Sequence, residues 1–195
     1  MKKRLSAIAV SAFLALSVTG CGIVTIVPIG EEAKYTGVEE FDSSAESSND
    51  WSQVVEEIKN TAADFSESVK DGGAKEAVAV KGIAKIIEFN TDTPKYYLLV
   101  EVDGYDGTEE VKIQAGGVYS GTTVRDVQTL KGFEDFTNQT EWSQYAKALN
   151  KEVDAQVVAP LALDESAAGK TVTFSGAAIA SGDTVTITPV ELTIE

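Results

Sequence analysis

The stretch AVAVKGIAKIIEFN, residues 77–90, decides the fold, because its apolar residues return with the two-residue period of a β-strand. The sequence predicts one long strand here, with Gly82 marking a bend. The following TDTP, residues 91–94, is typical of a turn. Two further strands are predicted at residues 96–102 and 111–115, separated by the turn sequence DGYDG. Three consecutive strands therefore begin the sheet.

A helix is predicted before this region, over residues 48–73. Ser48 or Asn49 is its expected N-cap, and Gly72-Gly73 is expected to end it. Its apolar residues follow one helical face: Trp51, Val54, Val55, Ile58, Ala62, Phe65 and Val69. This face is more typical of a core than of a ligand site.

A second helix is predicted over residues 138–158, after a less regular segment. Asn138 and Glu141 have the spacing of a capping box, and Thr137 is the alternative cap. Two final strands follow, in GKTVTFSG and VTITPVELTI. Their alternation changes phase at Pro189, which predicts a β-bulge or an edge position.

The predicted element order is a helix, three strands, a helix and two strands. Three strands, one helix and two strands form the order of the OB-fold, a small five-stranded barrel. We therefore expect an α+β protein with an OB-like five-stranded barrel over residues 74–195, residues 138–158 being its inserted helix. The segment 48–73 precedes the barrel as an N-terminal helical segment. An α+β sandwich is the structural alternative.

The start of the chain has the three parts of a secretory signal peptide, over residues 1–20. Lys2, Lys3 and Arg4 are basic, an apolar run follows, and small residues precede Cys21. This ending resembles the bacterial lipobox, in which the cysteine receives a diacylglyceryl group and the signal is cleaved before it. The alternative is an ordinary signal peptide, or a short anchor, with an incidental thiol.

Cys21 is the single cysteine of the chain, so lipidation explains it better than a disulfide or catalysis does. We expect a lipoprotein outside the cytoplasm, held at the membrane by acyl chains on Cys21. Residues 21–47 are expected to form an acidic, serine-rich spacer between this anchor and the folded part.

Composition argues against several classes of function. The formal net charge of −15 disfavours nucleic acid as a partner, because such a surface repels phosphates. The chain has no histidine, which argues against the usual zinc sites, Ser-His-Asp triads and haem ligation. No metal and no cofactor are therefore expected, and a catalytic role is not expected either.

Arg125 is the single arginine that follows Arg4, and it lies beside Asp126. Its planar, five-donor side chain suits a bidentate contact to a partner's carboxylate or a hydrogen bond to a sugar. The alternative is an internal ion pair that fixes the irregular segment. We favour the internal pair, because carboxylates are abundant nearby.

A wider polar cleft with an aromatic wall is a second hypothesis for this region. Sugar sites commonly combine planar polar side chains with a stacking ring. The candidate binding residues are Tyr119, Thr122, Arg125, Asp126, Asn138, Gln139 and Trp142. The alternative, which we favour, makes Asn138 a helix cap and Trp142 a core residue. The sequence DGYDG lacks the spacing of an EF-hand calcium loop and is better explained as a hairpin turn.

Several segments together resemble the predicted periplasmic lipoproteins of the family known as domain of unknown function 2291. They are CGIVTIVPIG at 21–30, FDSSAESSNDW at 41–51, GGVYSGTTVRD at 116–126, FEDFTNQTEWSQYAKALN at 133–150 and the C-terminal GKTVTFSGA and ITPVELTIE. The resemblance covers essentially the whole mature chain. It implies a helical piece with an OB-like barrel, no established activity, and a place beside components of sugar ABC transporters.

The leading functional hypothesis is a lipid-anchored, non-enzymatic accessory or binding component, linked to a sugar ABC transporter or a carbohydrate ligand. The barrel face and residues 116–142 are its expected contact surface. A carboxylate-dependent enzyme acting on envelope glycans is the alternative. A purely structural envelope protein is the third possibility.

Overall fold

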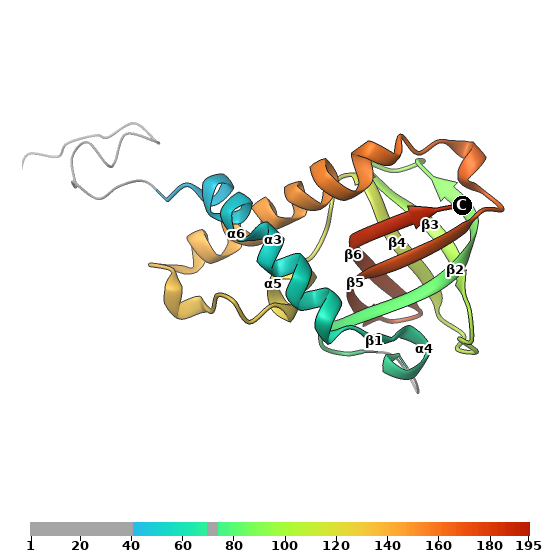
Figure 1. Ribbon diagram of the computed structural model, residues 1–195, viewed down its shortest axis with the longest axis horizontal. Coiled ribbons are helices and arrows are strands. Elements are labelled where there is room, and N and C mark those ends of the chain that lie inside the picture. Colours follow the sequence, from blue (N-terminus) through green and yellow to red (C-terminus); the bar gives the residue numbers. More distant parts are fainter. Residues whose placement is uncertain (1–40, 70–73) are drawn as a thin grey trace, which may run out of the picture. The chain divides into compact units, whose positions relative to one another are not determined.

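The computed structural model describes residues 41–69 and 74–195, and residues Asp42–Glu195 form one compact unit (Figure 1). The predicted signal peptide, Cys21 and the spacer up to residue 40 lie outside the described residues. Within the described ranges, no helix combines the length and apolar character needed to cross a bilayer.

Five strands close into a barrel, as predicted. They are β2 (Val78–Asn90), β3 (Lys95–Val102), β4 (Glu110–Gly117), β5 (Thr171–Ser181) and β6 (Thr184–Ile194). The strand order is β2-β3-β4-β6-β5, and pairing of β2 with β5 closes the ring. All neighbours are antiparallel except β4 and β6, which run parallel. A closed ring excludes the alternative of a sandwich.

Closure depends on the length of β2, which pairs with two strands in succession. Residues 78–85 pair with β5, and residues 84–90 pair with β3. The register irregularity falls at Ile87, not at the predicted bend, Gly82. Gly82 instead makes room for a ring: a Cβ there would lie 2.9 Å from Cζ of Phe174.

The phase change at Pro189 is a β-bulge in the β5–β6 hairpin, as predicted. Gly176 pairs with Pro189 and Ser175 pairs with Glu191, so Val190 is an extra residue on β6. Such a bulge increases local twist, which helps a short sheet curl into a barrel.

The core is formed by the buried alternating residues of the strands and by side chains from the helices. Phe65 packs edge-on against Phe174, with 6.1 Å between the ring centres, and against Tyr105 at 5.1 Å. Phe65 begins the short helix α4 (Phe65–Ser68), which follows the two-residue strand β1 (Ala63–Asp64) beside β2.

The first long helix, α3 (Ser43–Thr61), differs from its prediction at both ends. It begins before residue 48 because Asp42, not Ser48 or Asn49, is its N-cap, with Oδ1 accepting hydrogen bonds from the amides of Ser44 and Ala45. It ends at Thr61, and the chain continues as β1 and α4. The single helix over 48–73 is therefore wrong, and the spacer ends earlier than residue 47.

The second long helix, α6 (Gln139–Glu152), is capped by Asn138 as predicted. Asn138 accepts from the amides of Thr140 and Glu141, while the Glu141 carboxylate accepts from the amide of Thr137. A π-helical stretch, η2 (Val153–Val158), and a 3-10 turn, η3 (Ala159–Leu161), continue it. Figure 1 shows α3 and α6 side by side next to the barrel.

Candidate functional site

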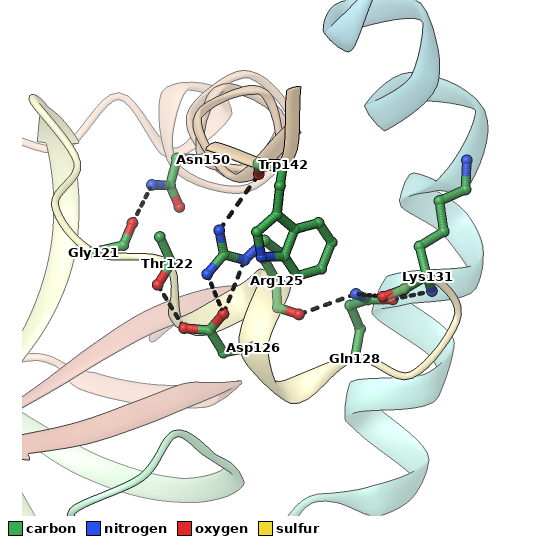
Figure 2. Close-up of polar contacts among 8 residues, drawn as sticks. All are labelled: Gly121, Thr122, Arg125, Asp126, Gln128, Lys131, Trp142 and Asn150. Carbon is green, nitrogen blue, oxygen red and sulfur yellow. Dashed lines mark hydrogen bonds and ion pairs between the residues drawn. The ribbon is translucent and has the colours of Figure 1, made fainter. Parts of the chain in front are cut away.

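Arg125 lies in the short helix α5 (Thr123–Val127) between Asp126 and the face of Trp142 (Figure 2). Its Nε and Nη2 donate to the same oxygen of Asp126, at 2.9 and 2.6 Å. The guanidinium carbon lies 4.3 Å from the centre of the Trp142 ring. Only 11% of the side chain is exposed. The planar guanidinium group of Arg125 therefore contacts groups of its own chain.

Asp126 is also engaged on its second oxygen, which accepts a hydrogen bond of 2.5 Å from the hydroxyl of Thr122. Arg125 Nη1 reaches the carbonyl of Trp142 at 3.4 Å. The structure thus brings together four of the predicted site residues, Thr122, Arg125, Asp126 and Trp142, as an internal cluster. We name these four residues the Arg125 cluster.

Trp142 also belongs to a group of aromatic side chains near α6 and α3. Its ring centre lies 5.0 Å from that of Phe136 and 6.2 Å from that of Tyr145. The buried hydroxyl of Tyr145 donates to Asp50 of α3 at 2.9 Å, and Lys131 lies 3.1 Å from the same carboxylate. The Arg125 cluster is therefore connected, through the rings of Trp142 and Tyr145, to Asp50 of α3.

Two other predicted site residues, Asn138 and Gln139, add no side chain to the Arg125 cluster, and Asn138 meets it only through its carbonyl, which accepts from the Trp142 amide at 3.2 Å. Both are exposed at the start of α6, and the Asn138 side chain is occupied by the cap. The structure does not bring them into a cleft with Arg125. The seven candidates therefore do not form one site.

Replacing Arg125 by alanine is expected to lower the free energy of unfolding by about 1–3 kcal/mol, because Asp126 loses its charged partner and the Trp142 face loses its cation. Arg125→Lys is expected to restore only part of this, since lysine lacks the planar fork. Urea denaturation measures both, with the exposed Lys85→Ala as the control. Unchanged stability of Arg125→Ala would contradict the internal role.

Tyr119, the remaining candidate, lines a separate pocket of about 280 Å³. Gly117, Val118, Lys147, Asn150, Lys151 and Asp154 complete the lining. We call this the Tyr119 pocket. The Tyr119 hydroxyl is buried and has no hydrogen bond of good geometry with any described residue, although the Asp154 carboxylate lies close enough to interact with it. Burial, the negative charge of Asp154 and a hydrogen-bonding interaction with that carboxylate, in this order, raise the pKa of this hydroxyl, so it stays protonated at neutral pH.

Two glycines shape the barrel side of the pocket. Gly116 and Gly117 have φ of 117° and 67°, values that favour glycine. A Cβ at Gly116 would lie 3.5 Å from the Tyr96 ring and 3.8 Å from an Asp154 oxygen. The Tyr96 ring, 37% exposed, therefore lies close to the pocket.

The helical side of the pocket was not predicted from sequence. Lys147, Asn150, Lys151 and Asp154 lie at i, i+3, i+4 and i+7, so they share one helical face that continues from α6 into η2. Asn150 donates from Nδ2 to the Gly121 carbonyl at 3.1 Å, which fixes its amide (Figure 2). The polar spacing at i, i+3, i+4 and i+7 is the signal in the sequence that indicates this face.

The arrangement can hold a small polar ligand. It offers a carboxylate, an amide oxygen, a phenol, two ammonium groups and a nearby aromatic ring. Among residues 41–69 and 74–195, no group of three or more His, Cys, Asp or Glu side chains is arranged to hold a metal ion.

Comparison with known proteins agrees with this architecture. An OB-fold protein from Thermotoga maritima MSB8, solved by crystallography, is 16% identical and has a TM-score of 0.61. The match covers 80% of this chain and 100% of the other, which confirms the predicted OB-like fold. Curated proteins give no match. A family model described as predicted periplasmic lipoprotein (DUF2291) matches residues 11–193, and the chain therefore belongs to this family.

Proposed function

We propose that this lipoprotein is a non-enzymatic binding component, anchored through lipid on Cys21, that holds a carbohydrate beside a sugar ABC transporter. One observation carries the proposal: the Tyr119 pocket contains a buried hydroxyl that makes no well-formed hydrogen bond with the described residues and has the Asp154 carboxylate as its neighbouring acceptor. A buried polar group without a partner costs free energy, so it is uncommon unless another molecule completes it.

Carbohydrate is the ligand class that matches the pocket chemistry. Sugar hydroxyls both donate and accept, which suits the Asp154 carboxylate, the Asn150 amide oxygen and the Tyr119 phenol. The apolar face of a sugar ring packs on an exposed aromatic ring such as Tyr96. A volume of about 280 Å³ is close to the lower end of small-molecule sites, so one or two rings fit better than a long chain.

The lining favours binding over hydrolysis. Glycoside hydrolysis usually requires two carboxyl groups on opposite sides of the bond that is cleaved. Asp154 is the one carboxylate among the residues that line the Tyr119 pocket. We therefore place the enzyme acting on envelope glycans second to the binding component.

In-cell photo-crosslinking tests the transporter link. A photoreactive amino acid at Val118, which is 53% exposed at the pocket, is compared with one at Ile83, 47% exposed on β2. Mass spectrometry should find a transporter permease or a sugar-binding protein crosslinked at position 118 and absent at position 83. The same products at both positions, or none at either, would contradict the proposed contact.

The anchor has its own test. The wild-type protein should incorporate radiolabelled lipid and sediment with membranes, whereas Cys21→Ala should carry no label. Each acyl methylene contributes about 0.8 kcal/mol to membrane binding, so loss of the chains should weaken retention severely. An unlabelled wild-type protein, with the variant still processed and localised normally, would contradict lipidation.

A further inference from the structure

We infer that the Tyr119 pocket takes a monosaccharide-sized polyol that carries a carboxylate or phosphate group. The inference rests on the proposed function and names its ligand class. It comes from two lysines on the pocket wall, Lys147 and Lys151, which no simple feature of the fold requires.

Neither lysine forms an ion pair with any described residue, in a chain with 31 acidic residues. Among the described lysines, Lys59, Lys112 and Lys131 form ion pairs and the others do not, so the position of Lys147 and Lys151 on the wall of one pocket is what distinguishes them. Lys147 and Lys151 are one helical turn apart, and like charges at that spacing repel each other. An anion placed between them relieves this repulsion.

Helix electrostatics explains only part of the arrangement. Lys151 lies in the last turn of α6, where a positive charge is favourable. Lys147 lies one turn earlier, where the effect of the helix dipole has fallen off. The pair is better explained by a common ligand than by the helix terminus.

The remaining wall fixes the orientation of that ligand. Asp154 lies one turn beyond Lys151 along the helix, and it repels an anionic group. The ligand anion therefore faces the lysines, and its hydroxyls face Asp154 and Tyr119. The Asn150 amide, held by the Gly121 carbonyl, lies between these ends on the same helical face. This separation of charge selects a polyol with an anionic group over a plain anion.

Isothermal titration calorimetry of the full lipidated chain in neutral detergent tests the inference. The probes are D-glucuronate, D-glucose 6-phosphate, D-glucose, acetate and inorganic phosphate. At least one anionic sugar should bind about tenfold or more tightly than glucose, because hydrogen bonds to charged groups are the stronger ones. Which of the two binds better identifies the anion as carboxylate or phosphate.

A charge-matched pair of variants gives the control. Lys147→Gln with Lys151→Gln should abolish the preference for the anionic sugar while leaving unfolding unchanged. Lys81→Gln with Lys85→Gln, which removes the same charge from exposed positions of β2, should retain it. Equal loss in both double variants would show a general charge effect and overturn the inference.

The other outcomes separate the two proposals. Glucose binding as tightly as the anionic sugars would overturn the inference and leave the carbohydrate-binding function standing. Acetate or phosphate binding as tightly as the sugars would show that the pocket is a plain anion site, and this result would overturn the inference. Absence of binding by all five probes would contradict both the inference and a monosaccharide-binding function.

Discussion

Replacing Phe174 by alanine is expected to lower the free energy of unfolding by about 3–5 kcal/mol. The ring is 1% exposed and contacts Phe65 edge-on, and Phe65 in turn contacts Tyr105. Removal of the ring leaves a cavity at the point where β2 and β5 close the barrel, since Phe174 pairs with Gly82. Urea denaturation monitored by circular dichroism measures the loss.

A double-mutant cycle with Gly82 tests the stated cause. Gly82→Ala alone should destabilise by about 1–3 kcal/mol, because its Cβ would lie 2.9 Å from Cζ of Phe174. In a Phe174→Leu background, the same change should cost less, because the ring is gone. Strictly additive effects, or a loss below about 1 kcal/mol for Phe174→Ala, would contradict this account of barrel closure.

Gly176→Ala is expected to be at least as damaging as typical overpacking, which costs about 1–3 kcal/mol and occasionally more. A Cβ at Gly176 would overlap the Thr188 carbonyl oxygen and would lie 2.9 Å from Cα of Pro189. Both are backbone atoms of the bulge on β6, so no side-chain rotation relieves the contact. We expect a cost at the upper end of this range, with loss of much of the soluble protein.

Gly182→Ala is the matched control, because Gly182 lies in the same hairpin. Its φ is 63°, and a Cβ there would meet no atom within 4 Å. This variant should cost only about 1–2 kcal/mol, from the left-handed backbone alone. If it were as damaging as Gly176→Ala, backbone conformation rather than close packing would explain the glycines of this hairpin.

The barrel could be predicted because its signal is local. Leu98, Val100 and Ile113 are buried in the positions that strict alternation gives them, and the Pro189 bulge interrupts alternation visibly. Strand pairing was predicted only through the element order. The parallel pairing of β4 with β6 joins residues far apart in the chain, and no local pattern encodes it.

The start of α3 was missed because tertiary packing outweighs composition there. The segment SSAESSND is polar enough to resemble a spacer, yet Ser47 and Asp50 are buried. Asp50 is held by Tyr145 and Lys131, which lie about 80 residues or more further along the chain. The sequence of this segment alone does not predict such distant partners.

The sequence also predicts only part of the candidate site. An internal ion pair is the favoured prediction for Arg125 because carboxylates are abundant nearby, and its partner is the adjacent Asp126. Tyr119 lies in another pocket, just after Gly116 and Gly117, the two positive-φ glycines that end β4. Helical periodicity places Lys147 and Asp154 on one face, but only the folded chain brings that face to Tyr119.

The unfolding free energy of Tyr119→Phe, measured without ligand, tests most directly whether the Tyr119 pocket is arranged for a ligand. The hydroxyl makes no well-formed hydrogen bond with the described residues, and the nearby Asp154 carboxylate is the one acceptor that interacts with it in the pocket, so its removal should leave stability unchanged or raise it. If the Tyr119 hydroxyl formed a hydrogen bond within the protein, Tyr119→Phe would lower the free energy of unfolding. A loss of more than about 1 kcal/mol in Tyr119→Phe would show a structural hydrogen bond and contradict the account.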